Sequence, residues 1–248
     1  MRGLFWPLLN LQLGSSLVLG ALVFGIKRLL PEFTFLKYLS YFWLTQALLL
    51  AAVGASIAFH IEEIAGPGWA IGLPFSLGLL QPAFMAAAAL SLRRVPAGRT
   101  VAGLAAVSLA AGWGLAIALN LVPMEMATRL LAARSTLTGL AVLWFAWEFR
   151  RVTESASRPG RQFAAVLCGL YACHHFLAVL GTVHRGPYWE GPQGVPATLA
   201  GGLFTVTIAG VLVWTLTREA VISLRRSHEY ERRFRVLMDE TRMAGMIL

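Results

Sequence analysis

The stretch FAAVLCGLYACHHFLAVLGTV, residues 163–183, decides the fold class. It is apolar over about 20 residues, enough for an α-helix to cross a hydrocarbon core about 30 Å thick. Six further runs have the same character: residues 4–26, 35–61, 69–92, 100–122, 126–149 and 197–216. Because lipid offers the backbone no hydrogen bonds, runs of this length without two-residue alternation can only be helices. We therefore predict an all-α membrane protein, a bundle of seven transmembrane helices.

The amino-acid composition supports this fold class, because it differs from that of an average soluble protein. Of the 248 residues, 57% are hydrophobic and 13% are charged, far from the usual soluble balance. The first run is too long for a signal peptide and no cleavage site precedes Lys27, so we expect it to remain as an anchor. Cys168 and Cys173 lie five residues apart in one helix, so they point in different directions and are expected to be small buried side chains rather than a disulfide.

The basic residues predict the orientation of the bundle. Most of them follow the first, third and fifth runs or lie in the C-terminal segment, and Lys and Arg are retained on the cytoplasmic side. We therefore predict an N-terminus outside and a C-terminus in the cytoplasm, in the inner (plasma) membrane of a bacterium, with multiple passes. The formal charge of +9 is then explained by loops beside anionic lipid head groups, so we expect the lipid bilayer and no nucleic acid as partner.

Composition changes sharply after Leu216. The segment 217–242 is rich in charge and keeps a narrow apolar stripe, which includes Tyr230, Phe234 and Leu237. This spacing predicts a cytoplasmic signalling helix, coiled-coil-like and continuous with the seventh span. Two arrangements stay open: a parallel homodimer through this helix, or a helix lying on the membrane surface.

The last residues carry a resemblance to a known domain. The sequence YERRFRVLMDETRMAGMIL resembles the entry into a PAS domain, on the order of Phe234, Arg235, Leu237, Glu240 and the closing run 246–248. The resemblance implies that residues 243–248 are the truncated start of a PAS domain, after a sensor domain of residues 1–216.

A second resemblance concerns the membrane part. The stretch FTFLKYLSYFWLTQALLLA, residues 33–51, resembles the N-terminal seven-transmembrane sensor regions of bacterial histidine kinases, diguanylate cyclases and phosphodiesterases. The resemblance implies an input module of signal transduction, such as a two-component system. It implies no catalytic domain in these residues and a histidine kinase or diguanylate cyclase as the full-length parent.

Polar residues are predicted to concentrate in the outer half of the bundle. Counting about 1.5 Å per residue along each helix places them at one depth, and intramembrane ionisable groups suggest a functional site. Arg134 would contact an anionic or polar ligand group, one of the neighbouring histidines would hydrogen-bond it, and Trp113 would form an apolar wall. The alternative is that Arg134 pairs with Glu125 or a carbonyl to fix packing. The predicted ligand-binding residues are Arg134, His174, His175, Trp113, Ser16 and Glu125.

A second possible site lies at the outer rim. His60 and Glu63 share a helix face and His184 ends another helix at similar height, a set of ligands that suits a transition metal. Haem would need His60 with His184 as axial ligands. The cofactor therefore remains open.

These patterns leave three functions. The first is a membrane sensory input module that detects a small molecule or ion from the periplasmic side or the membrane. The second is a metal- or haem-binding redox protein of the membrane. The third is a small transporter, against which stand the absence of paired broken helices and the long charged tail.

Overall fold

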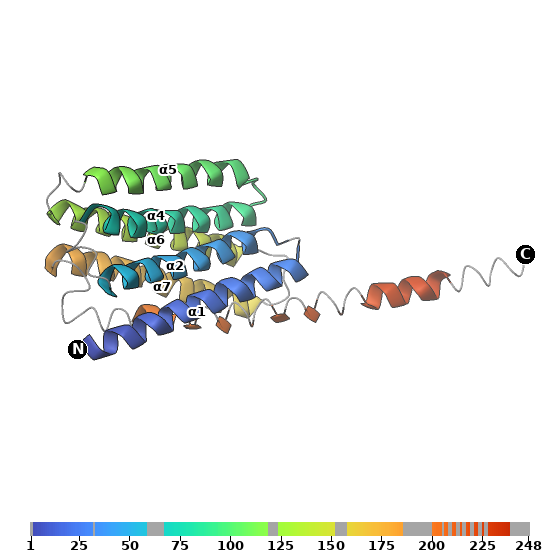
Figure 1. Ribbon diagram of the computed structural model, residues 1–248. Helices are drawn as coiled ribbons and strands as arrows, with labels where there is room; N and C mark the ends of the chain where they lie inside the picture. The colour runs from blue at the N-terminus through green and yellow to red at the C-terminus, as the bar shows by residue number, and fades with distance from the viewer. Residues whose placement is uncertain are drawn as a thin grey trace, which may run out of the picture.

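The computed structural model describes a chain built from helices (Figure 1). It describes residues 2–31, 33–58, 67–118, 124–151, 158–185, 200–204, 206–207, 210–211, 214, 217–218, 221–222, 225 and 228–238. The helices are α1 (Arg2–Leu29), α2 (Phe35–Ala58), α4 (Pro67–Leu92), α5 (Gly98–Ala118), α6 (Met124–Arg151) and α7 (Arg158–Arg185). Every described residue from 200 to 238 is also helical, and no strand occurs in the ranges above. The all-α prediction is confirmed.

Successive helices run up and down beside one another (Figure 1). α4 is central, since it packs against α2, α5 and α6, whereas α5 lies at one edge and contacts α4 alone among the helices named above. We call the end where α1 begins the N-terminal end of the bundle. The opposite end is the tail end, because residues 228–238 project beyond the bundle there, exposed along their whole length (Figure 1).

Four of the helices have the length and apolar character of membrane spans. They are Trp6–Leu29 in α1, Phe35–Ala55 in α2, Gly72–Leu92 in α4 and Gln162–Leu180 in α7. They correspond to four of the seven predicted runs. α6 is long enough to span but carries Arg134 and Glu148 within it, and charged residues lower the hydropathy of such a segment. The fold is thus an all-helical bundle of membrane-protein character.

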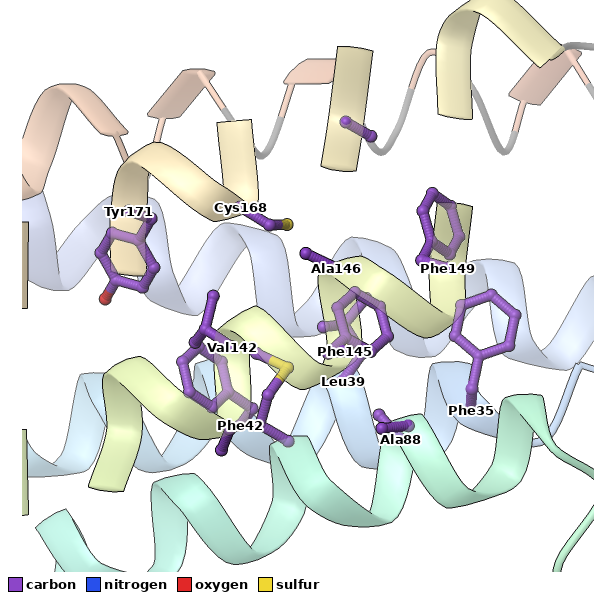
Figure 2. Packing of buried hydrophobic residues seen from close by; sticks show 14 of the residues in the cluster. Phe35, Leu39, Phe42, Ala88, Val142, Phe145, Ala146, Phe149, Cys168 and Tyr171 are labelled. Carbon is purple, nitrogen blue, oxygen red and sulfur yellow. The ribbon is translucent and has the colours of Figure 1, made fainter. Parts of the chain in front are cut away.

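An aromatic and aliphatic core fills the half of the bundle nearest the tail end (Figure 2). Phe35 of α2 lies 6.4 Å from Phe145 and 6.1 Å from Phe149, ring centre to ring centre, and the two α6 rings stack at 5.6 Å. Small residues of α4, such as Ala88, let the neighbouring helices approach. Cys168 belongs to this core, but Cys173 is exposed on the bundle surface. The expectation of two buried cysteines is therefore wrong for Cys173, because the two lie on different faces of α7.

An ion pair closes the core at the tail end. Arg93, in the turn after α4, donates a hydrogen bond of 2.6 Å to Glu148 of α6, whose side chain is only 7% exposed. The hydrogen bond and the charge of Glu148 raise the pKa of Arg93 above its ordinary value. The pair therefore joins the ends of α4 and α6.

The same turn has a strained backbone position. Arg94 has a φ of 60°, a left-handed conformation that costs a residue with a Cβ about 1 to 2 kcal/mol. The Arg94 amide donates to the Ser91 carbonyl at 3.0 Å and the Val95 amide to the Leu90 carbonyl at 3.1 Å. This is the Schellman arrangement, in which Arg94 holds the position that glycine usually takes.

α5 depends on one close approach to α4. A Cβ added to Gly112 would lie 2.7 Å from the Cα of Ser76, whereas one added to Gly114 would have no heavy atom within 4 Å. We expect Gly112→Ala to lower the free energy of unfolding by about 2 kcal/mol, since a backbone atom cannot move aside cheaply. Gly114→Ala on the same helix is the matched control and should not destabilise. Thermal unfolding in detergent would measure both, and equal effects would contradict this contact.

Arg94 provides a test of backbone strain. Arg94→Gly and Arg94→Ala both remove the side chain and differ only in the cost of the left-handed conformation. We expect the Gly variant to have the higher free energy of unfolding, by about 1 kcal/mol. Unfolding in mixed detergent micelles would compare them, and a more stable Ala variant would show that the turn has another conformation.

Candidate functional site

Buried polar side chains meet in the part of the bundle nearer the N-terminal end. On α1, α4, α6 and α7 they lie roughly 15 to 20 Å along the helix from that end, at about 1.5 Å per residue. We call the set the polar layer. Its members are Gln12 and Ser16 of α1, Trp43 and Gln46 of α2, Gln81 of α4, Arg134 of α6, and Tyr171, His174 and His175 of α7.

Arg134 lies between α6 and α4. A Cβ added to Gly78 of α4 would lie 2.8 Å from its Nη1 and 2.9 Å from its Nε, so the guanidinium fits only because position 78 is glycine. Pro82, four residues later, has no N–H to donate to the Gly78 carbonyl. The cation therefore lies against a helix segment in which one carbonyl lacks its usual helical donor. The Nε of Arg134 is buried and has no hydrogen-bond partner among the described residues.

Tyr171 connects the two histidines. Its ring centre lies 4.8 Å from that of His175, edge to face, and 6.3 Å from that of His174, stacked. Both contacts follow from spacing, since residues three and four positions along a helix from Tyr171 lie on the same side as it. α6 and α7 approach closely near this level, since a Cβ added to Gly139 of α6 would lie 3.0 Å from the Phe176 ring of α7.

His174 connects the polar layer to the C-terminal helix. Its ring centre lies 5.9 Å from that of Phe204. A Cβ added to Gly201 would lie 3.3 Å from the His174 Nε2 and 3.1 Å from the Gln12 Nε2. The helical residues 200–204 therefore rest directly on the polar side chains of α1 and α7.

α2 and α4 complete the layer. The Gln81 side-chain amide donates a hydrogen bond to the Gln46 side-chain oxygen, and the Trp43 ring lies 6.3 Å from that of Tyr171. Ser16 is fully buried one turn after Gln12. The layer thus continues from the α4–α6 contact across to α1 and α2.

Four atoms of the layer are buried with no hydrogen-bond partner in the described structure: Ser16 Oγ, Trp43 Nε1, Arg134 Nε and His175 Nε2. Buried polar groups are normally hydrogen-bonded, and an orphaned one costs free energy. The indole and guanidinium groups can only donate, the hydroxyl can also accept, and the imidazole does either according to its tautomer. Acceptor atoms, from water or from a polar ligand, would satisfy them.

The structure brings most of the predicted ligand-binding residues to this layer. Arg134, His174 and His175 lie in it with the contacts above, and Ser16 is buried at the same depth. Both histidines contact the Tyr171 ring, in different geometries. His175 has its Nε2 buried, while His174 faces the C-terminal helix.

Trp113 is not brought to this layer. It is 51% exposed on α5, beside Gly112, which packs on Ser76 of α4. Ser76 and Gly78 lie two residues apart and point to nearly opposite faces of α4. Trp113 therefore lies across α4 from Arg134, which packs against Gly78 on the other face of that helix.

The remaining predicted site residues lie outside the described structure. His60 and Glu63 fall between described helices, and the side chains of Glu125 and His184 are not described. Within the described part, no group of three His, Cys, Asp or Glu side chains lies close enough together to hold a metal ion.

Several members of the polar layer, and two glycines that contact it, were not predicted. Tyr171 had a signal in the sequence, since it lies three and four residues before the paired histidines. Gly78 had one in part, because it lies four residues before Pro82. Gln81, Trp43 and Gly201 had none, since nothing in the sequence shows which helices pack together.

Comparisons with known proteins add no relative: no family model matches the chain, and no curated protein or solved structure matches it significantly.

The contact between Arg134 and Gly78 predicts a coupling between two substitutions. Gly78→Ala should destabilise the wild-type protein, because the new methyl group displaces the guanidinium. In an Arg134→Ala background the same change should cost less, with a coupling free energy of about 1 to 2 kcal/mol. Thermal unfolding of the four proteins measures the cycle. Gly103→Ala, which meets no heavy atom within 4 Å, is the control and should be additive. An equal cost of Gly78→Ala in both backgrounds would show that the Arg134 side chain does not lie against Gly78.

Proposed function

We propose that this protein is the membrane sensory input module of a bacterial signal-transduction protein, a sensor histidine kinase. The module detects a small molecule or ion at the polar layer and signals through the C-terminal helix. The observation that carries the proposal is the set of buried, unpartnered polar atoms around Arg134 and His175, in a polar layer whose members His174 and Gln12 contact the helical residues 200–204.

The proposal includes seven transmembrane passes. α5 and α6 pack beside the four candidate spans, and the described residues from 200 onward run beside the bundle before they project from its tail end (Figure 1). An odd number of passes puts the start of α1 and the projecting helix on opposite sides. Lys27, Arg28, Arg93, Arg150 and Arg151 all lie at the tail end. The excess of basic residues favours the cytoplasm for that end.

The chemistry of the layer supports a ligand that offers acceptor atoms. The Arg134 Nε and the Trp43 Nε1 can only donate, and a guanidinium in a low-dielectric site favours an anionic or strongly polar group. A ligand signals only if it binds two arrangements of the protein unequally. Binding at Arg134 would favour the arrangement in which the guanidinium leaves Gly78 and turns to the ligand.

The contact between His174 and the C-terminal helix supplies the connection to the output. A movement of Arg134 would reach α7 through the close contact of the two helices, where Gly139 of α6 lies against the Phe176 ring, and on α7 the Tyr171 ring stacks on that of His174. His174 in turn packs on Phe204 and Gly201. A shift of residues 200–204 is carried along the helix to the exposed segment 228–238, where a second copy would receive it as a change of rotation or spacing.

Distances between two copies of the projecting helix test this function. A nitroxide at Tyr230→Cys, in a background with Cys168→Ala and Cys173→Ala, reports the separation of two chains in one nanodisc by pulsed electron paramagnetic resonance. We expect a defined separation that Arg134→Gln shifts by several ångströms. Arg99→Gln, at an exposed position at the start of α5, removes the same charge and should leave the separation unchanged.

Two outcomes would overturn the proposal. The absence of any separation in the measurable range would exclude a dimer through this helix. Gly201→Ala presses on His174 and Gln12. If the separation in this variant and in Arg134→Gln equals that of the wild type, the polar layer does not act on the projecting helix.

A further inference from the structure

Three aromatic rings at the tail end, exposed or partly exposed, each lie near a basic side chain. The Arg28 guanidinium lies 5.0 Å from the Phe24 ring centre, and the Arg218 guanidinium lies 5.6 Å from that of Trp214. The Lys37 ammonium lies 5.9 Å from the Tyr38 ring. Helix directions put all three pairs at the tail end of the bundle. Tryptophan and tyrosine gather where a membrane protein meets the head groups.

Trp147 differs from the other rings because two guanidiniums share it. The carbon Cζ of Arg151 lies 4.3 Å and that of Arg150 lies 5.5 Å from its ring centre. Trp147 itself is 47% exposed on α6. A guanidinium that stacks on an aromatic face keeps its N–H edge free, in a geometry that matches the oxygens of a phosphate.

The neighbouring carboxylate is already used. Glu148 is buried and accepts the hydrogen bond of Arg93 at 2.6 Å. Arg150 and Arg151 therefore add two positive charges at Trp147, next to the Arg93–Glu148 ion pair, whose charges cancel. An anion at this place would find electrostatic complementarity.

An apolar stripe leads along α6 to the two arginines. Leu137, Leu140 and Leu143 are exposed on the same helix as Trp147, and steps of three and four residues keep all four on one face. Ten residues from Leu137 to Trp147 span about 15 Å at about 1.5 Å per residue. This matches one leaflet, which is half of a hydrocarbon core about 30 Å thick.

We propose that this face of α6 binds one anionic phospholipid, with its phosphate on Arg150 and Arg151, its glycerol region against Trp147, and an acyl chain along the leucine stripe. The charge, the ring and the apolar length occur in the order in which a lipid presents its parts. This site lies at the tail end, away from the polar layer, and needs only that α6 crosses the membrane. It stands or falls independently of the sensor function.

Binding of phosphatidylglycerol to the full chain tests the site. Native mass spectrometry from detergent would count bound lipid, and thermal unfolding in nanodiscs of phosphatidylcholine with increasing phosphatidylglycerol would measure its effect on stability. We expect one preferentially retained phosphatidylglycerol and a melting temperature that rises with its fraction. The double variant Arg150→Gln/Arg151→Gln should bind it about 30-fold more weakly, from the usual attraction of two basic residues to an anionic surface.

A matched control separates this site from general surface charge. Arg232→Gln/Arg233→Gln removes an adjacent arginine pair from the exposed helix 228–238, and it should bind the lipid as the wild type does. Trp147→Leu keeps every charge and extends the stripe, so it should fold and still lose part of the affinity.

Three results would overturn the proposal. If the two double-arginine variants lose equal affinity for phosphatidylglycerol, the binding depends on net charge alone. If phosphatidylcholine is retained as well as phosphatidylglycerol, the negative charge of the lipid has no role. A rise in melting temperature with inorganic phosphate in phosphatidylcholine nanodiscs, as large as that with the lipid, would make the site a phosphate site without a lipid.

Discussion

A polar side chain inside a membrane bundle has to be covered by other helices. The guanidinium of Arg134 shows how strict this constraint is. It fits against α4 only where Gly78 leaves out a Cβ, and a proline one turn later leaves a carbonyl there without its helical donor. Near the N-terminal end, the contact of α4 with α6 therefore involves one charge, one glycine and one proline.

The two halves of the bundle are packed by different forces. Near the tail end, aromatic rings such as Phe35, Phe145 and Phe149 interlock, and the Arg93–Glu148 pair joins two helix ends over them. Dense apolar packing of this kind resists deformation. Near the N-terminal end, orphaned polar atoms have several ways to be satisfied. The proposed sensor function would use this difference between a densely packed half and a half with orphaned polar atoms.

The C-terminal helix touches the half with orphaned polar atoms. Gly201 and Phe204 rest on His174, so the described helical residues 200–204 contact the polar layer directly. The lipid-facing side of α6 has a separate role in the proposed scheme. There Trp147 and its two arginines hold the helix end at the level of the head groups, which fixes the depth of the bundle against which the output helix moves.

The sequence by itself determined that the chain is helical, where most helices begin and end, and that Arg134, His174, His175 and Ser16 lie at one depth. Hydropathy and a fixed rise per residue are local properties, and depth along a helix follows from counting. Only the tertiary structure decided which faces meet. It set Arg134 against α4, placed Trp113 on the far side of that helix, and set Gly201 and Phe204 against His174. The neighbour of a helix face is chosen by close approach at residues such as Gly78 and Gly112, and packing of this kind is a property of pairs of helices that no single run of residues contains.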